Sequence, residues 1–187
     1  MSCCITIPRL TNMYLTGIIL PIVLTQPSID RSEILGARID YDNYLKAVSG
    51  KTLPVRLDII WNDEYHPICI ADFFYRIYRR YKYGRTHDVQ TLYLNYNNGR
   101  IMSIKSNNFS ENDKYTFNNY ENIRHETYEY RTSDFETYKE NSNIFISTWN
   151  HIFSKYDYNK NLSKNHYKLG EDIPVYMNRN FKYNLNE

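Results

Sequence analysis

The chain has 187 residues, of which 42% are hydrophobic and 24% charged, and its 23 Lys and Arg against 21 Asp and Glu give a net charge of +2. This length is enough for one domain with a sizeable core, and the balance excludes an acidic disordered chain, a histone-like polycation and a multispan membrane protein. Tyrosine is in excess, with 20 residues. Because Tyr, Asn, Ile and Lys share AT-rich codons, we attribute the excess to an AT-rich genome and expect a protein of a virus or an intracellular parasite.

An apolar run, MYLTGIILPIVL, covers residues 13–24 near the N-terminus. The run is too short for a transmembrane helix, and Gly17 and Pro21 interrupt it, so no transmembrane span is expected. A secretory signal carries basic residues before its apolar run, whereas only Arg9 stands there. We therefore expect an intracellular protein of the cytoplasm or nucleus, with secretion through a weak N-terminal signal as the alternative.

The chain has three cysteines, Cys3, Cys4 and Cys69. Neighbouring cysteines rarely bond to each other, so a disulfide scaffold is excluded. The odd count is typical of a reducing compartment, with a single bridge from Cys3 or Cys4 to Cys69 as the alternative in an oxidising one. No second pair of cysteines or histidines completes a four-ligand zinc site. The sequence accordingly predicts no metal and no cofactor.

The middle of the chain carries the clearest structural signals. Residues 54–61 (PVRLDIIW) alternate in the manner of a β-strand. Residues 67–83 are predicted to form a long amphipathic helix that ends at Gly84. Its apolar residues recur at steps of three and four: Ile70, Phe73, Phe74, Ile77, Tyr78 and Tyr81. An Asn-Asn-Gly turn lies between residues 88–96 and residues 100–106, and this pattern predicts a β-hairpin.

The C-terminal half is less regular. Residues 107–122 are polar and are interpreted as a loop, and three strands are expected at 123–131, 134–138 and 143–148. Thr148 is in position to cap a shorter helix over 149–156. The segment 173–176 is a candidate edge strand.

These elements predict an α+β fold. We expect a single domain over 1–187 with a mixed or mainly antiparallel sheet, the 67–83 helix packed across the sheet and the 149–156 helix near the end. Residues 1–30 would form an apolar N-terminal segment and residues 157–187 an irregular polar tail.

The predicted long helix also carries the first functional hypothesis. Residues 73–85 (FFYRIYRRYKYGR) combine positive charge with aromatic rings, which suits contact with phosphates, bases or an acidic protein. The same pattern fits an ordinary surface helix whose charged side chains face water. The hypothesis is a non-enzymatic interaction protein that binds a host protein or nucleic acid, and it requires the arginines to share one solvent-exposed face. The candidate binding residues are Tyr75, Arg76, Arg79, Arg80, Lys82 and Tyr83.

An alternative is a hydrolase such as a metal-dependent phosphodiesterase. His125, Glu136 and His151 belong to neighbouring predicted elements, and imidazole with carboxylate is the pair used for metal binding or acid–base work. This idea requires the three side chains to meet in one cleft. The sequence contains no Gly-x-Ser-x-Gly elbow of a serine hydrolase, and the balance of the sequence favours a non-enzymatic role.

Overall fold

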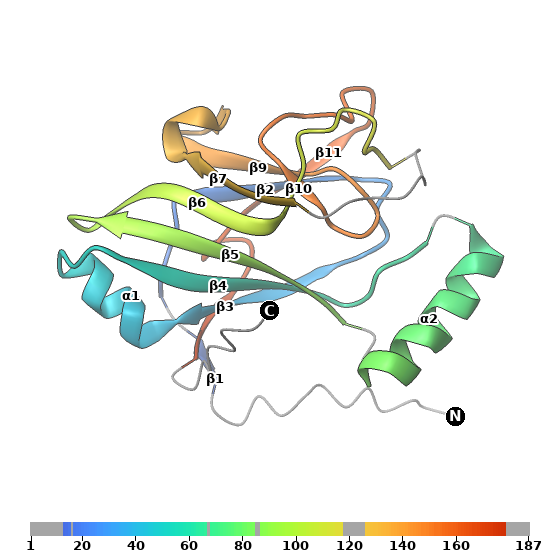
Figure 1. The fold of residues 1–187 in the computed structure, drawn as a ribbon, viewed down its shortest axis with the longest axis horizontal. Helices are drawn as coiled ribbons and strands as arrows, with labels where there is room; N and C mark the ends of the chain where they lie inside the picture. Colours follow the sequence, from blue (N-terminus) through green and yellow to red (C-terminus); the bar gives the residue numbers. More distant parts are fainter. Residues whose placement is uncertain (1–12, 16, 67, 85–86, 118–125, 179–187) are drawn as a thin grey trace.

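The computed structural model describes residues 13–15, 17–66, 68–84, 87–117 and 126–178, and within these ranges the chain is mostly β-strand. Twelve strands join one sheet that curls into a half-barrel, in the order β1-β12-β3-β4-β5-β6-β10-β9-β2-β11, with β7 paired to β6 and β8 to β9 (Figure 1). The described strands are β1 (Met13–Leu15), β2 (Ile22–Pro27), β3 (Ile34–Asp40), β4 (Leu53–Trp61), β5 (Asp88–Asn97), β6 (Arg100–Phe109), β7 (Glu126–Arg131), β8 (Thr137–Tyr138), β9 (Asn141–Ile146), β10 (Phe153–Ser154), β11 (Lys164–Lys168) and β12 (Val175–Asn178). A 3-10 turn, η1 (Thr132–Asp134), follows β7.

The antiparallel run β3-β4-β5-β6 forms the centre of the sheet. In β4 the side chains of Val55, Leu57, Ile59 and Trp61 are fully buried, as the alternation in the sequence predicted. The β5–β6 hairpin turns at Asn98 and Gly99, which both have positive φ, as the Asn-Gly signal predicted. Strands β2, β9 and β10 bring further apolar residues to the same core from the other half of the curl.

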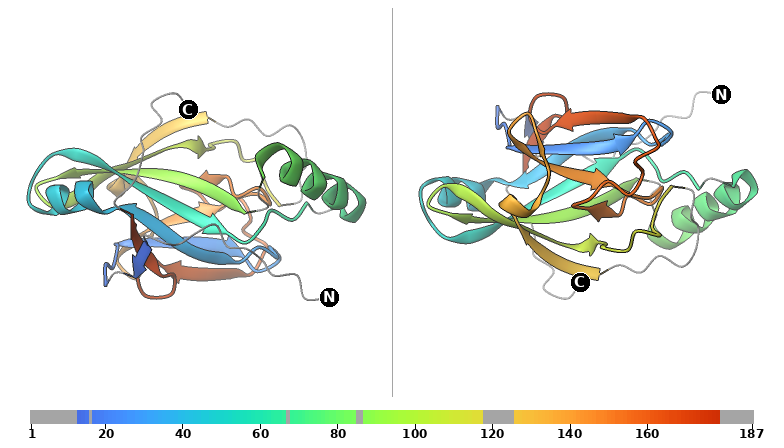
Figure 2. Two further views of the ribbon diagram at one scale, coloured as in Figure 1. Left: turned by 90° about the horizontal axis from the view of Figure 1, so that it is seen from below. Right: turned by 90° about the horizontal axis from the view of Figure 1, so that it is seen from above.

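The predicted α+β architecture is wrong. The long helix does form, as α2 (Cys69–Tyr83), and Gly84 ends it in the left-handed conformation as predicted. However, α2 does not pack across the sheet: it projects from one end of the curled sheet, next to the end of β4 and the start of β5 (Figures 1 and 2). The fold is therefore a single curled β-sheet, a half-barrel, with helices at its ends.

The second predicted helix, over 149–156, does not exist. Thr148 does accept a hydrogen bond from a nearby amide, that of Ile152 at 3.1 Å, but the bond closes a tight loop between β9 and β10. His151 adopts a left-handed conformation with φ of 57° inside this loop, and a helix cannot continue through such a residue. Phe153 and Ser154 then pair with β9 and β6 as β10.

Three further segments add to the predicted elements or depart from them. Residues 41–48 form a short helix, α1 (Tyr41–Val48), whose first turn is capped by the Asp40 side chain. The region after residue 157, expected to be an irregular tail with a candidate edge strand at 173–176, contributes β11 and β12 to the sheet. Strand β12 overlaps the candidate, but it lies between β1 and β3 and is therefore not at the edge. The apolar run near the N-terminus supplies β1 and β2, two separate strands. No helix in the described part of the chain is long and apolar enough to cross a membrane.

Two glycines with positive φ offer a matched test of the packing at the β11–β12 turn. Gly170 has φ of 94° and Gly50 has φ of 100°, but only at Gly170 would an added Cβ fall 2.1 Å from the Ile18 carbonyl oxygen. Gly50→Ala is expected to lower the free energy of unfolding by about 1 to 2 kcal/mol through backbone strain alone. Gly170→Ala is expected to lower the free energy of unfolding, measured by urea titration, clearly more than Gly50→Ala does. An equal decrease in both variants would contradict the close approach of residue 170 to the Ile18 carbonyl oxygen.

Candidate functional site

Helix α2 exposes its apolar side. Six large apolar side chains on it are between 48% and 92% exposed: Ile70, Phe73, Phe74, Ile77, Tyr78 and Tyr81. Their spacing of three and four residues places them along one stripe of the helix. We call these six residues the apolar stripe.

The opposite side of α2 faces the protein body and is polar. Arg79 is only 5% exposed, and its Nη1 donates to Asp63 Oδ1 at 3.1 Å while its Nη2 donates to the His87 carbonyl at 3.1 Å. The Tyr75 hydroxyl donates to Glu64 Oε2 at 2.6 Å. The helix is thus attached to the sheet by charge and hydrogen bonds.

The reason for this orientation lies in the segment before the helix. Asp63 and Glu64 follow β4 directly and are buried, and buried carboxylates require cationic or hydrogen-bonding partners. The Arg79 guanidinium supplies them, with Nη1 also 3.7 Å from Glu64 Oε2 and Nη2 3.8 Å from Asp88 Oδ1. The carboxylates therefore turn the arginine side of α2 inward, and the apolar stripe is left on the surface.

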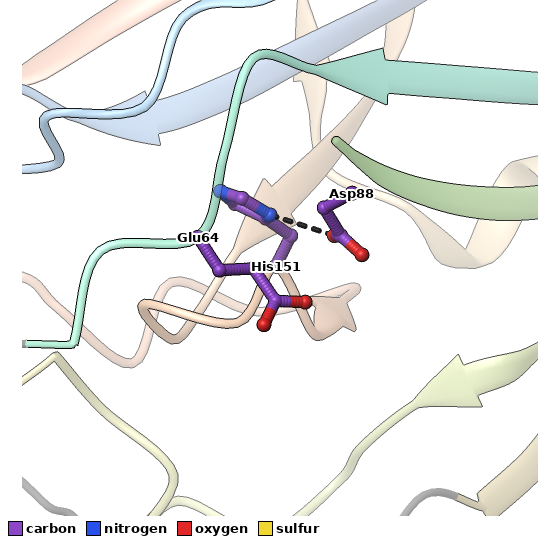
Figure 3. A group of neighbouring side chains, drawn as sticks. All are labelled: Glu64, Asp88 and His151. Atoms are coloured by element: carbon purple, nitrogen blue, oxygen red, sulfur yellow. Dashed lines mark hydrogen bonds and ion pairs between the residues drawn. The ribbon is translucent and has the colours of Figure 1, made fainter. Parts of the chain in front are cut away.

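A buried histidine completes this polar cluster. The His151 ring is fully buried and stacks on Trp61, with ring centroids 4.3 Å apart and planes inclined by 9°. Its Nδ1 lies 2.8 Å from Asp88 Oδ2 (Figure 3). Its Nε2 lies 3.5 Å from Asp30 Oδ2. The left-handed backbone at His151 is what brings the ring to this position from the β9–β10 loop.

Burial and the crowding of carboxylates perturb the pKa of each group in the cluster. Burial, with the neighbouring charge of Asp88, raises the pKa of Glu64 to about 8. Burial would raise the pKa of Asp88 too, but hydrogen bonding to His151 and the imidazolium charge outweigh it and lower that pKa to about 2. Burial would lower the pKa of His151, and its contacts with Asp30 and Asp88 reverse the effect and raise it to about 9.

The candidate binding residues of the helix divide into two groups. Arg80 and Lys82 are exposed, and Arg76 is half-exposed with its Nε 2.9 Å from Asp63 Oδ2. Arg79 is buried, so the expectation of three arginines on one solvent-exposed face does not hold for it. Tyr75 points to Glu64, and the side chain of Tyr83 lies outside the described part of the structure. A binding role for these residues stays a prediction.

Of the proposed hydrolase residues, the two that the structure describes, Glu136 and His151, are not brought together. His125 lies outside the described residues, Glu136 is exposed before β8, and the ring nitrogens of His151 face Asp88 and Asp30. The sequence analysis identified His151 but missed Glu64 and Asp88. Their positions at the end of β4 and the start of β5 are adjacent only because those two strands pair, with Trp61 opposite Asp88.

Three further features belong to this region. A shallow hollow of about 310 Å³ runs along α2, lined by Cys69, Asp72, Phe73, Arg76, Ile77 and Arg80. Glu64, Asp88 and His151 each offer one oxygen or nitrogen within 4.8 Å of the others, close enough to hold a metal ion (Figure 3). Cys69 is exposed and unbonded at the start of the helix.

Comparison with known proteins gives no relative for this chain: no family model, no curated protein and no solved structure matches it.

The anchoring of α2 can be tested with two neighbouring arginines. Arg79→Met would leave Asp63 without its buried partner and is expected to lower the free energy of unfolding by about 3 to 5 kcal/mol. Arg80→Met removes an exposed charge and is expected to change the free energy of unfolding by no more than about 0.5 kcal/mol. Urea unfolding monitored by circular dichroism compares the two, and similar losses would contradict the inward orientation of Arg79.

Proposed function

We propose that this chain is a non-enzymatic binding protein that docks α2 into an apolar groove on a partner protein. The observation that carries the proposal is the orientation of the helix, whose arginine side is tied to buried carboxylates while the apolar stripe faces solvent. An ordinary surface helix is oriented the other way, with its apolar side on the core.

The apolar stripe is unusual for an isolated soluble protein. Burying one large apolar side chain contributes about 1.5 to 3 kcal/mol of favourable free energy. A partner that covers the six exposed side chains of the stripe therefore gains a large favourable contribution to its binding free energy. Contiguous exposed apolar patches commonly mark interaction sites. Helices that bind in grooves place their apolar anchors at positions i, i+3 or i+4, and i+7. The apolar stripe has this spacing, with Ile70 at i, Phe73 and Phe74 at i+3 and i+4, and Ile77 at i+7.

The flanking charge defines the chemistry of the partner. Arg80 and Lys82 are exposed beside the stripe, and the hollow along the helix is bordered by Arg76 and Arg80. A groove with an apolar floor and carboxylates on its rim complements this surface. Nucleic acid fits less well, because Arg79 is engaged inside the protein and the most exposed part of the helix is apolar.

The proposal is tested by comparing three forms of the full chain on one identified partner. The wild-type protein is purified with its partner from the native source, the partner is identified by mass spectrometry, and its affinity is then measured with both proteins pure. Phe73→Ser combined with Ile77→Ser is expected to weaken binding by at least about 100-fold, because central apolar anchors dominate such interfaces. Ile29→Ser is the control, since Ile29 is an equally exposed apolar residue outside the helix.

Three other results would contradict the proposal. Equal affinity of the stripe variant and the wild type would remove α2 from the interface. The wild type, with no protein partner, could bind anionic lipid vesicles and the Phe73→Ser, Ile77→Ser variant fail to, which would assign the helix to a membrane surface. The same outcome with single-stranded oligonucleotides would assign it to nucleic acid. Light scattering could also show that the wild type self-associates and that the same variant does not. That result would make a second copy of this chain the partner.

A further inference from the structure

The cluster beneath α2 contains more negative charge than its permanent cations balance. The side chains of Asp30, Asp63, Glu64 and Asp88 are each at most 9% exposed. Among the described residues that pair with them, only Arg76 and Arg79 carry a fixed positive charge. Both lie nearest to Asp63, and Arg79 is also 3.7 Å from Glu64 and 3.8 Å from Asp88. Four carboxylates set against two arginines leave two carboxylates without a permanent counter-charge. In the metal-free protein protons meet that charge, because the pKa values of Glu64 and His151 are both raised, and a divalent cation can take the place of those protons. Buried charge of this kind is paired or coordinates a metal.

The remaining donors come from three separate parts of the fold. Glu64 follows β4, Asp88 begins β5, and His151 lies in the β9–β10 loop, yet their ligand atoms lie within 4.8 Å of one another. All three residues are buried. Their Nδ1 and carboxylate oxygens form a mixed nitrogen and oxygen set that suits a divalent transition-metal ion.

Each of the three donors also has the outer partner that metal ligands typically have. The His151 Nε2 is buried and lies 3.5 Å from Asp30 Oδ2, so a carboxylate stands behind the ring. The Tyr75 hydroxyl donates to Glu64, and Gln90 Nε2 donates to Asp88 Oδ2 at 2.8 Å. Such outer contacts fix the orientation of ligands and raise their affinity for the ion.

We propose that Glu64, Asp88 and His151 form a binding site for one divalent transition-metal ion. Arg79 does not occupy this position, because its shortest contact, 3.1 Å, is to Asp63, and it stays 3.7 Å and 3.8 Å from the two carboxylate ligands. Tyr75 belongs to α2 and donates to Glu64, so the site lies directly beneath the helix. The site is independent of whatever binds the apolar stripe.

The test uses Mn²⁺, which favours oxygen and imidazole ligands over the thiolates of the three cysteines. The full chain is treated with a chelator, dialysed and titrated with Mn²⁺, and free ion is counted by electron paramagnetic resonance. One tightly bound Mn²⁺ per chain is expected, with an increase in Tm. Tyr75→Phe is expected to weaken binding by about 10-fold, and Glu64→Gln by more, because the first removes an outer partner and the second a ligand.

Controls separate loss of the site from loss of the fold. Glu136→Gln removes an exposed carboxylate and is expected to bind Mn²⁺ as the wild type does. Glu64→Gln retains an oxygen that accepts from Tyr75, and its circular dichroism and urea midpoint show whether it folds; if it does not, Tyr75→Phe carries the test. The absence of bound Mn²⁺ at millimolar concentration, or equal affinity in Glu64→Gln and the wild type, would overturn the proposal and leave protons as the compensating charge.

Discussion

The ion pair between Arg79 and the carboxylates at the end of β4 determines how the ends of this molecule are arranged. Asp63 and Glu64 are buried by the chain around them, and a buried carboxylate without a partner is costly. The guanidinium that compensates them is carried by α2, so the helix must present its polar side to the body. The exposure of the apolar stripe is a consequence of that constraint, and the proposed docking role depends on it.

The same cluster joins the two halves of the curled sheet. Asp88 lies at the start of β5, while His151 arrives from the loop between β9 and β10, and their contact is supported by the stacking of His151 on Trp61 of β4. The backbone of His151 is held in a left-handed conformation that is unfavourable for a residue with a side chain. The contacts of the ring with Trp61, Asp88 and Asp30 offset this strain, and they tie the loop to the end of the molecule where α2 projects.

Sequence patterns predicted the parts of the fold that depend on local physics. Strand β4 was visible from its alternation, the β5–β6 hairpin from Asn98-Gly99, and the end of α2 from Gly84. The periodicity of α2 could show that the helix has an apolar side, but not which side meets the protein, because that depends on carboxylates whose burial is set by the whole sheet. The supposed helix over 149–156 failed for a related reason: Thr148 has the same capping signature in a tight turn as at a helix start.

The polar cluster itself could be predicted only in part. His151 stood out as a titratable residue, yet its partners Asp88 and Asp30 are distant in sequence and adjacent only in the folded chain. A search by motif spacing, which excluded a metal site built on the cysteines, has no means of finding donors that come from three separate elements. Glu136 and His151, which are closer in sequence, end in unlike environments because one is exposed before β8 and the other is fully buried.

The orientation of α2 is tested most directly by hydroxyl-radical footprinting of the dilute, isolated chain, with oxidation rates read for each aromatic residue by mass spectrometry. The structure predicts fast oxidation of Phe73, Phe74 and Tyr81, and protection of the fully buried Phe109 and Phe153 in the same sample. Protection of the three helix residues to the level of the two core residues would mean that the apolar stripe packs against the sheet. That result would contradict both the inward arginine and the docking role derived from it.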